Sequence, residues 1–138
     1  MTDFINDLGV TLAWLATAVV LMAVGFGVVD LLTPGRLTRQ VSANLNAGLL
    51  VGAKLLAVGI IVFAAIWTAP DSLDEGLLEA VLYSLLGLLI SAAAFLAIDL
   101  VLPVRLRHLV NEDRFDPATC VAVGAEIGLA LVVAAAIS

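Results

Sequence analysis

Residues 45–69 read LNAGLLVGAKLLAVGIIVFAAIWTA, and Lys54 is the one charged residue in this stretch of 25. A helix needs about 20 consecutive apolar residues to cross the hydrocarbon core of a bilayer, so this stretch predicts a transmembrane helix. Three further runs of this kind extend from Leu8 to Leu32, from Leu77 to Leu102 and from Ala118 to Ile137. No run shows strand-like alternation, which disfavours a β-barrel. The sequence therefore predicts an all-α integral membrane protein with four transmembrane helices.

The composition of the whole chain excludes several classes of function. Of its 138 residues, 63% are hydrophobic and 13% are charged, whereas soluble domains are about half apolar and a quarter charged. The net charge of −6 disfavours a nucleic-acid partner. One cysteine and one histidine offer neither a disulfide nor a metal-ligand cluster. No nucleophile–base pair or phosphate-binding loop is present in the sequence. We therefore expect that the protein is not an enzyme and binds neither a cofactor nor a metal ion.

The charged residues predict the orientation in the membrane. Five of the six basic residues lie in the first and third loops: Arg36, Arg39, Arg105, Arg107 and Arg114. The charged residues of the second loop are all acidic. By the positive-inside rule the first and third loops are cytoplasmic and both termini are outside. The N-terminal tail has no basic residue, so we expect the first apolar segment to be retained rather than cleaved as a signal peptide.

The two halves of the chain share short motifs. Asp30-Leu-Leu-Thr-Pro34 recurs as Asp99-Leu-Val-Leu-Pro103, an offset of 69 residues. Val51-Gly-Ala-Lys54 recurs as Val123-Gly-Ala-Glu126, an offset of 72. Because each half contains two helices, both copies insert with the same orientation, which predicts a parallel repeat. We therefore expect two two-helix repeats, residues 1–69 and 70–138, in one compact membrane domain.

The segment VVDLLTPGRL at 28–37, the Asn44 and Asn46 region and the two-by-two helix repeat resemble the YjfL-like bacterial inner-membrane family, domain-of-unknown-function family 350. The resemblance covers nearly the whole chain. It rests mainly on Asp30, Thr33, Pro34, Gly35 and Asn46, with Asp99 and Pro103 as a weaker second copy. The second half departs from the first at Val104, where a glycine would follow the proline, and at Asp116-Pro117-Ala118, which replaces an Asn-x-Ala start. The resemblance implies an uncharacterised protein of the bacterial cytoplasmic membrane, often associated with envelope-stress gene neighbourhoods, and supplies no reaction.

Lys54 and Glu126 are ionisable residues within predicted spans. Each lies ten residues beyond a predicted helix start, at Asn44 and Asp116, so a rise of about 1.5 Å per residue puts both near mid-membrane. A charge there costs about 2.5 to 3.5 kcal/mol on insertion scales, so we expect both to face the protein interior. Their opposite signs favour a buried pair that fixes helix register. An ion or proton pathway, snorkelling, and pairing across an oligomer interface stay open as alternatives.

Asp30 and Asp99 lie at the predicted cytoplasmic ends of the first and third helices, where an acid opposes the helix dipole. Each is followed by a turn, Thr33-Pro34-Gly35 in the first copy and Pro103 in the second. We favour a structural elbow in which an arginine of the following loop pairs with the acid. Capping of the next span, and cation or proton binding, are the alternatives.

The starts of the spans carry helix-capping residues. Asn44 or Asn46 can cap the second span, and Asp116, followed by a proline, can cap the fourth. Ser72-Leu-Asp-Glu75 has the form of a capping box before the third.

Small residues predict where the spans pack closely. Gly48-x-x-x-Gly52 lies in the second span and Gly124-x-x-x-Gly128 in the fourth, and this spacing favours close helix approach.

Other side chains are expected at the membrane surfaces. Trp14, Trp67 and Tyr83 lie toward the predicted outer ends of spans, where aromatic residues anchor helices. Arg105 and Arg107 belong to a short amphipathic stretch that we expect to meet anionic lipid at the cytoplasmic face.

Two classes of function remain. The favoured one is a non-enzymatic membrane component, an envelope-stress or scaffold protein that interacts with lipid and a soluble cytoplasmic partner through its basic loops. The alternative is a small proton or cation transporter, or a channel subunit, in which Lys54, Glu126, Asp30 and Asp99 line a path after homo-oligomerisation. The first is favoured because the mid-membrane charges can neutralise each other and no span carries an unpaired polar stripe.

Overall fold

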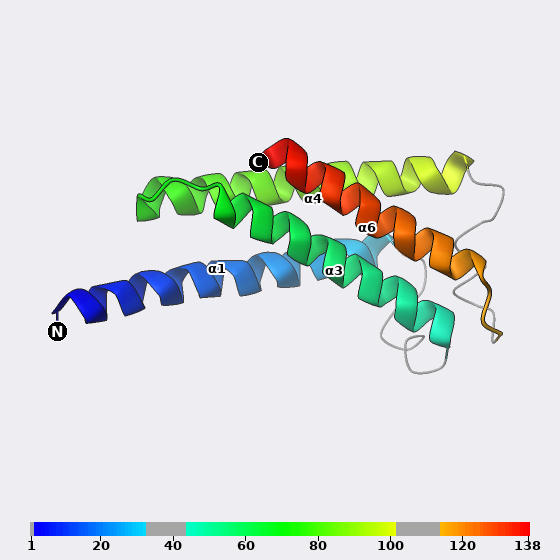
Figure 1. Cartoon of the computed structure of the whole chain (residues 1–138), viewed down its shortest axis with the longest axis horizontal. Helices are drawn as coiled ribbons and strands as arrows, with labels where there is room; N and C mark the ends of the chain where they lie inside the picture. The colour runs from blue at the N-terminus through cyan, green and yellow to red at the C-terminus, as the bar shows by residue number, and fades with distance from the viewer. Residues whose placement is uncertain (1, 33–43, 102–113) are drawn as a thin grey trace.

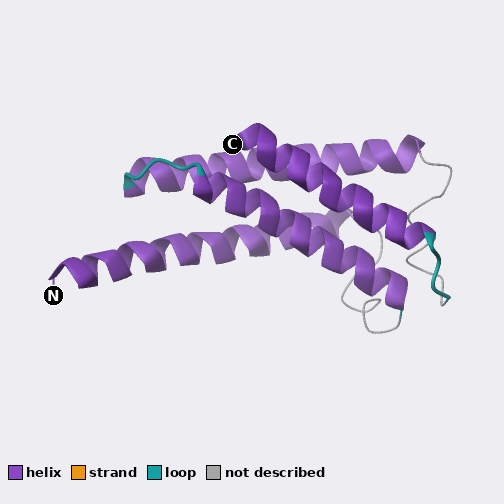
Figure 2. Ribbon diagram, viewed as in Figure 1, coloured by secondary structure: helices purple, strands orange, loops and turns teal. Residues whose placement is uncertain are grey.

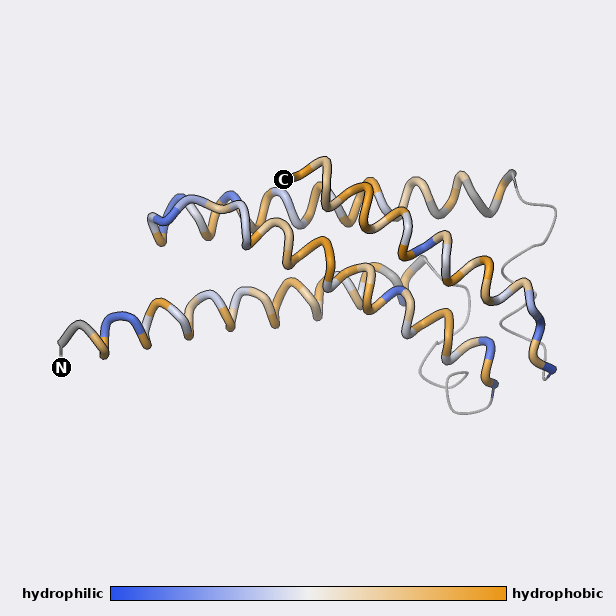
Figure 3. The backbone as a smooth tube through the Cα atoms, viewed as in Figure 1, coloured by the Kyte–Doolittle hydropathy of each residue, from blue (hydrophilic) through white to orange (hydrophobic). Residues whose placement is uncertain are grey.

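The computed structural model describes residues 2–32, 44–101 and 114–138, and the regular structure within these ranges is helical throughout (Figure 2). The helices are α1 (Thr2–Leu32), α3 (Leu45–Trp67), α4 (Leu73–Val101) and α6 (Ala118–Ile137). Each is long and apolar enough to cross a membrane. Residues along most of the helices are hydrophobic, and residues at the α3–α4 connection are hydrophilic (Figure 3). The predicted all-α membrane fold with four spans is therefore confirmed.

The helix ends follow the predicted spans closely, with two extensions and one shortening. α6 has the predicted bounds, whereas α3 ends at Trp67, three residues before Pro70, which has no N–H to continue the helix. α1 and α4 begin earlier, at Thr2 and Leu73. Hydropathy marks only the part of a helix that is apolar, and these first turns are polar. Acids in the first turn of α4 also interact favourably with the helix dipole.

The four helices alternate in direction along the bundle (Figure 1). As a result α3 and α6 run parallel to each other, and both begin at the end of the bundle where α1 and α4 finish. α3 and α4 each contact both α1 and α6, and the most extensive packing is between α3 and α6. In the most apolar part of α3, 56% of the residues are buried, against 11% in α1. α3 is therefore the central helix of the bundle.

The apolar core forms three clusters along α3. Nearest the start of α3, Ala47 and Leu50 pack against Ala122 of α6. Further along, Ala57 and Ile61 pack against Ala130 and Val133 of α6. On its other side, α3 contributes to a third cluster with α1 and α4, made of Leu21, Val58, Val62 and Leu88. The α3–α6 contact thus uses mainly alanine and other short side chains, which allow close helix approach in membranes.

The predicted close packing is not found among the described residues at three of the four glycines, Gly52, Gly124 and Gly128. A Cβ atom added to Gly52, Gly124 or Gly128 would meet nothing within 4 Å, and all three residues are exposed. Successive residues of an α-helix are about 100° apart, so a glycine two positions from Lys54 or Glu126 points to roughly the opposite side of its helix. Because the two charged residues face each other, these glycines face outward. Gly48, the remaining member, is half-buried.

Close packing occurs instead at two other glycines. A Cβ atom at Gly87 of α4 would lie 2.6 Å from Ile61 Cγ2, and one at Gly25 of α1 would lie 2.5 Å from Val58 Cγ1. Both contacts are to α3, so α1 and α4 each approach the central helix at a glycine. Alanine therefore provides the close approach between α3 and α6, and glycine provides it on the other two sides of α3.

Candidate functional site

Lys54 and Glu126 form an ion pair between α3 and α6. The Lys54 ammonium donates a hydrogen bond to Glu126 Oε2 at 3.2 Å. The two side chains are 9% and 11% exposed. The sequence left several interpretations of these two residues open. The contact in the structure matches one of them, the buried pair. Each charge lies in a segment apolar enough to span the membrane and has its counter-charge on the neighbouring helix.

The ion pair lies between two apolar layers of the same interface. Leu50 is one turn before Lys54 and Ala57 is one turn after it, and these residues belong to the two clusters that join α3 to α6. The residues around the pair therefore offer little competing polarity, which strengthens the attraction between the two charges. An ion pair in such surroundings is strongly destabilised if one partner is removed.

Asn46 is the centre of a second group of polar contacts, about two turns before Lys54 on α3. Its side chain is fully buried. Its Nδ2 donates to the Arg114 carbonyl at 2.7 Å, and its Oδ1 accepts from the Asp116 N–H at 3.2 Å and from the Thr119 hydroxyl at 3.0 Å. One side chain of α3 thus binds the backbone just before α6 and a side chain in the first turn of α6. We call Asn46, Lys54, Thr119 and Glu126 the polar interface.

The two helices of the polar interface begin with similar caps. Asn44 Oδ1 accepts from the Asn46 N–H at 2.9 Å, and Asp116 Oδ1 accepts from the Ala118 N–H at 2.8 Å. Pro117 already has helical dihedral angles, as a first-turn proline should. Of the two asparagines that could cap α3, Asn44 is the cap. The prediction that Asn46 might serve as a cap is wrong, because its side chain is turned into the α3–α6 contact.

The remaining predicted site residues are less fully described. Asp30 is half-buried in the last turns of α1. Arg114 is exposed and is fixed through its carbonyl by Asn46. The Asp99 side chain lies outside the described residues, as do the turn residues Thr33, Pro34, Gly35 and Pro103 and the basic residues Arg36, Arg39, Arg105 and Arg107. Their predicted roles therefore remain predictions.

Thr119 is a member of the polar interface that the sequence analysis missed. It is fully buried and hydrogen-bonded to Asn46. The spacing of the polar residues could have indicated it. Asn46 and Lys54 are eight residues apart and Thr119 and Glu126 are seven apart, so the two residues of each pair lie on the same face of their helix. Two parallel helices with polar residues at matching intervals can pair them in register.

The polar interface links α3 to α6 through side-chain contacts. The side-chain hydrogen bonds of Asn46, Thr119, Lys54 and Glu126 given above all join α3 to α6 or to the residues just before α6. Within the described ranges no group of three His, Cys, Asp or Glu residues is placed to hold a metal ion. A buried network with satisfied partners rigidifies the elements that it joins.

Comparison with known proteins agrees with the membrane fold. The sequence model of the family described as Domain of Unknown Function (DUF350) matches residues 3–137. A UPF0719 transmembrane protein of Mycolicibacterium paratuberculosis is 31% identical over 130 residues, which cover 93% of this chain and 86% of the relative. UPF0719 transmembrane proteins of Mycobacterium bovis and Mycobacterium tuberculosis are each 27% identical over 140 residues, covering all of this chain and 92% of each relative. No solved structure matches the chain. This polytopic membrane protein therefore belongs to the DUF350 family.

Proposed function

We infer that the protein is a non-enzymatic membrane scaffold, in which the polar interface fixes the helices that carry the basic cytoplasmic loops. The observation that carries this proposal is the paired state of the intramembrane charges, with Lys54 bonded to Glu126 across α3 and α6. Charges that neutralise each other within a span fix the register of two helices. A transport path would instead need groups that stay available to the transported ion.

A second contact ties a loop to the bundle. Because Asn46 binds both the Arg114 carbonyl and the Asp116 N–H, the last residues of the third loop are fixed to the start of α3. The third loop carries Arg105 and Arg107 in its sequence, and the first loop carries Arg36 and Arg39. In the proposed function these arginines contact anionic lipid at the cytoplasmic face and bind an acidic surface of a soluble cytoplasmic partner. The envelope-stress role implied by the family resemblance is consistent with such a partner.

The test is recovery of the partner after crosslinking in intact cells and purification of the full chain. We expect a soluble protein to copurify with the wild type and to be lost from the Arg105→Ala/Arg107→Ala double variant. Asp74→Asn/Glu75→Gln is the control, because it changes two exposed charges in the first turn of α4, outside both basic loops. Retention of the same protein by the arginine double variant would contradict the proposal.

The alternative function is a small proton or cation transporter, or a channel subunit. One observation favours it: Ser84 of α4 is fully buried, and its hydroxyl has no hydrogen-bond partner among the described residues. Such a group could bind water within the bundle. Proteoliposomes with an internal pH indicator separate the two functions. A proton flux that the wild type supports and Glu126→Gln abolishes would establish transport and overturn the scaffold proposal.

A further inference from the structure

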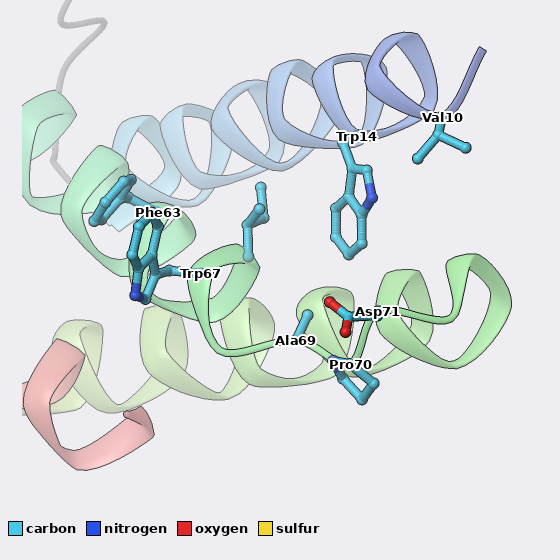
Figure 4. Close-up of a pocket in the computed structure, with 8 residues that line it drawn as sticks. Val10, Trp14, Phe63, Trp67, Ala69, Pro70 and Asp71 are labelled. Carbon is cyan, nitrogen blue, oxygen red and sulfur yellow. The ribbon is translucent and has the colours of Figure 1, made fainter. Parts of the chain in front are cut away.

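A pocket of about 400 Å³ lies at the end of the bundle that carries the α3–α4 connection. Three separate elements line it, as Figure 4 shows. These are α1 with Val10 and Trp14, α3 with Phe63, Ile66 and Trp67, and the connection with Ala69, Pro70 and Asp71. We call it the aromatic pocket. None of its lining residues belongs to the polar interface, so it is a separate feature of the molecule.

Three of the residues that line the aromatic pocket carry aromatic rings: Trp14, Phe63 and Trp67. Phe63 and Trp67 stack on each other, with ring centroids 5.7 Å apart and an angle of 25° between the planes. Both rings are largely exposed, at 64% and 76%. Trp14 extends from α1 toward the α3–α4 connection (Figure 4). Its ring edge packs over Gly76 of α4, where an added Cβ would lie 3.2 Å from two ring carbons.

The pocket carries one charged group, the carboxylate of Asp71, which is exposed. Among the residues that the structure describes, none forms a hydrogen bond or an ion pair with it. Asp74 and Glu75 follow on α4, and residues 68–79 contain no basic residue. The surroundings of the pocket are therefore negative, so a cation is favoured there and an anion is disfavoured.

We propose that the aromatic pocket binds an organic ammonium group between the Trp14 ring and the Asp71 carboxylate, which lie toward each other in Figure 4, with the carboxylate providing its counter-charge. Tryptophan is the ring that attracts cations most strongly, and recognition of alkylated ammonium groups by aromatic side chains is a general use of this interaction. The apolar lining from Val10, Ile66 and Pro70 suits the carbon substituents of the ligand. The volume admits a head group or a small amphiphile. The ammonium group can belong to a lipid head group or to a soluble organic cation.

Interfacial anchoring of Trp14 and Trp67, which the sequence predicts, does not by itself produce this binding. An anchoring tryptophan interacts with the membrane surface through its amphipathic ring and does not distinguish a cation from a neutral molecule of the same shape. Recognition by rings and a carboxylate does make this distinction. The preference for charge over shape is therefore the property to measure.

Intrinsic fluorescence measures occupancy of the pocket directly. The chain contains two tryptophans, Trp14 and Trp67, and both line the aromatic pocket. The full chain is titrated in maltoside micelles, which contain no ammonium group, with benzyltrimethylammonium and with its neutral isostere neopentylbenzene. We expect a saturable change in tryptophan fluorescence with the cation and affinity at least about tenfold weaker for the isostere.

Two acid variants locate the site. Asp71→Asn is expected to weaken cation affinity about tenfold, because it removes the counter-charge in the pocket. Asp74→Asn removes an exposed carboxylate of the same acidic segment that does not line the pocket, and we expect its affinity to stay within about twofold of the wild type. Nanodiscs separate the two sources of ligand. Weaker cation binding in discs with phosphatidylcholine than in discs without it identifies a lipid head group as the occupant, and equal binding identifies a soluble cation.

Either nanodisc result supports the proposal. It is overturned if the neutral isostere binds the wild type as tightly as the cation, or if the cation response does not saturate. It is also overturned if Asp71→Asn and Asp74→Asn weaken binding equally. The comparison of the two ligands uses only the wild-type chain, so the test remains decisive if a variant fails to fold.

Discussion

Replacing Lys54 by leucine removes the cation of the ion pair and leaves the Glu126 carboxylate between apolar layers of α3 and α6. Removing one partner of a buried ion pair typically costs about 3 to 5 kcal/mol of stability. The structure supports a value in this range. At the 3.2 Å separation of Nζ and Oε2, the attraction is about 5 kcal/mol with an effective dielectric constant near 20. We therefore expect Lys54→Leu to lower the free energy of unfolding by about 3 to 5 kcal/mol.

The double variant Lys54→Leu/Glu126→Leu is expected to be more stable than Lys54→Leu alone. Replacement of both charges by apolar side chains leaves no unpaired group and is often neutral or stabilising. Adding the single variant Glu126→Leu completes a double-mutant cycle, and the coupling of the two residues is the effect of the double variant minus the effects of both single variants. We expect this coupling to exceed about 2 kcal/mol.

The assay is titration of the protein in maltoside micelles with SDS, followed by tryptophan fluorescence. Trp14 lies on α1 and Trp67 at the end of α3, so separation of these helices changes the surroundings of both. Asp74→Asn is the control, because loss of an exposed acid in the first turn of α4 should change stability by no more than about 1 kcal/mol. If the effects of Lys54→Leu and Glu126→Leu add to the effect of the double variant within about 0.5 kcal/mol, the two residues are not coupled and the reasoning is refuted.

The same titration checks two further expectations. Asn46→Ala should lower the free energy of unfolding by about 1 to 3 kcal/mol for each buried group that it leaves unsatisfied. Thr119→Val removes one hydroxyl and should lower it by about 1 kcal/mol. If both effects are negligible, the Asn46 contacts do not stabilise the α3–α6 interface. Gly87→Ala should lower the free energy of unfolding by about 1 to 3 kcal/mol, because the added methyl group would overlap Ile61. Gly124→Ala should be neutral or slightly stabilising. A larger loss of stability in Gly124→Ala than in Gly87→Ala would show that the glycines of the GxxxG spacing do pack against a neighbouring helix.

Hydropathy was sufficient to predict the four spans, and side-chain chemistry predicted the caps at Asn44 and Asp116. Both signals are local, since a helix of about 20 apolar residues and an Asx cap depend on neighbouring residues in the chain. The facing of Lys54 and Glu126 was also predictable, because burying a single charge in a span is costly. Asn46 was misjudged because an asparagine near a helix start has two uses, and only the neighbouring helix determines which one applies.

The error at the glycines has a different cause. The spacing Gly-x-x-x-Gly was interpreted without the rotation of the helix, although the predicted pairing of Lys54 with Glu126 already places Gly52 and Gly124 on the outer side. The aromatic pocket could not be predicted at all. Its residues come from α1, α3 and the α3–α4 connection, and no local pattern shows that Trp14 lies near Asp71.

The central claim is that α3 and α6 are joined by a direct contact between Lys54 and Glu126. Lys54 is the single lysine of the chain, so ¹⁵N-labelled lysine places the label at one site. With ¹³Cδ-labelled glutamate, solid-state NMR in bilayers measures the distance from the lysine Nζ to the nearest glutamate carboxylate. We predict a measurable dipolar coupling between ¹⁵Nζ and ¹³Cδ, as a 3.2 Å contact between Nζ and Oε2 requires, and we expect it to disappear in Glu126→Gln. A wild-type protein without this coupling would contradict the account.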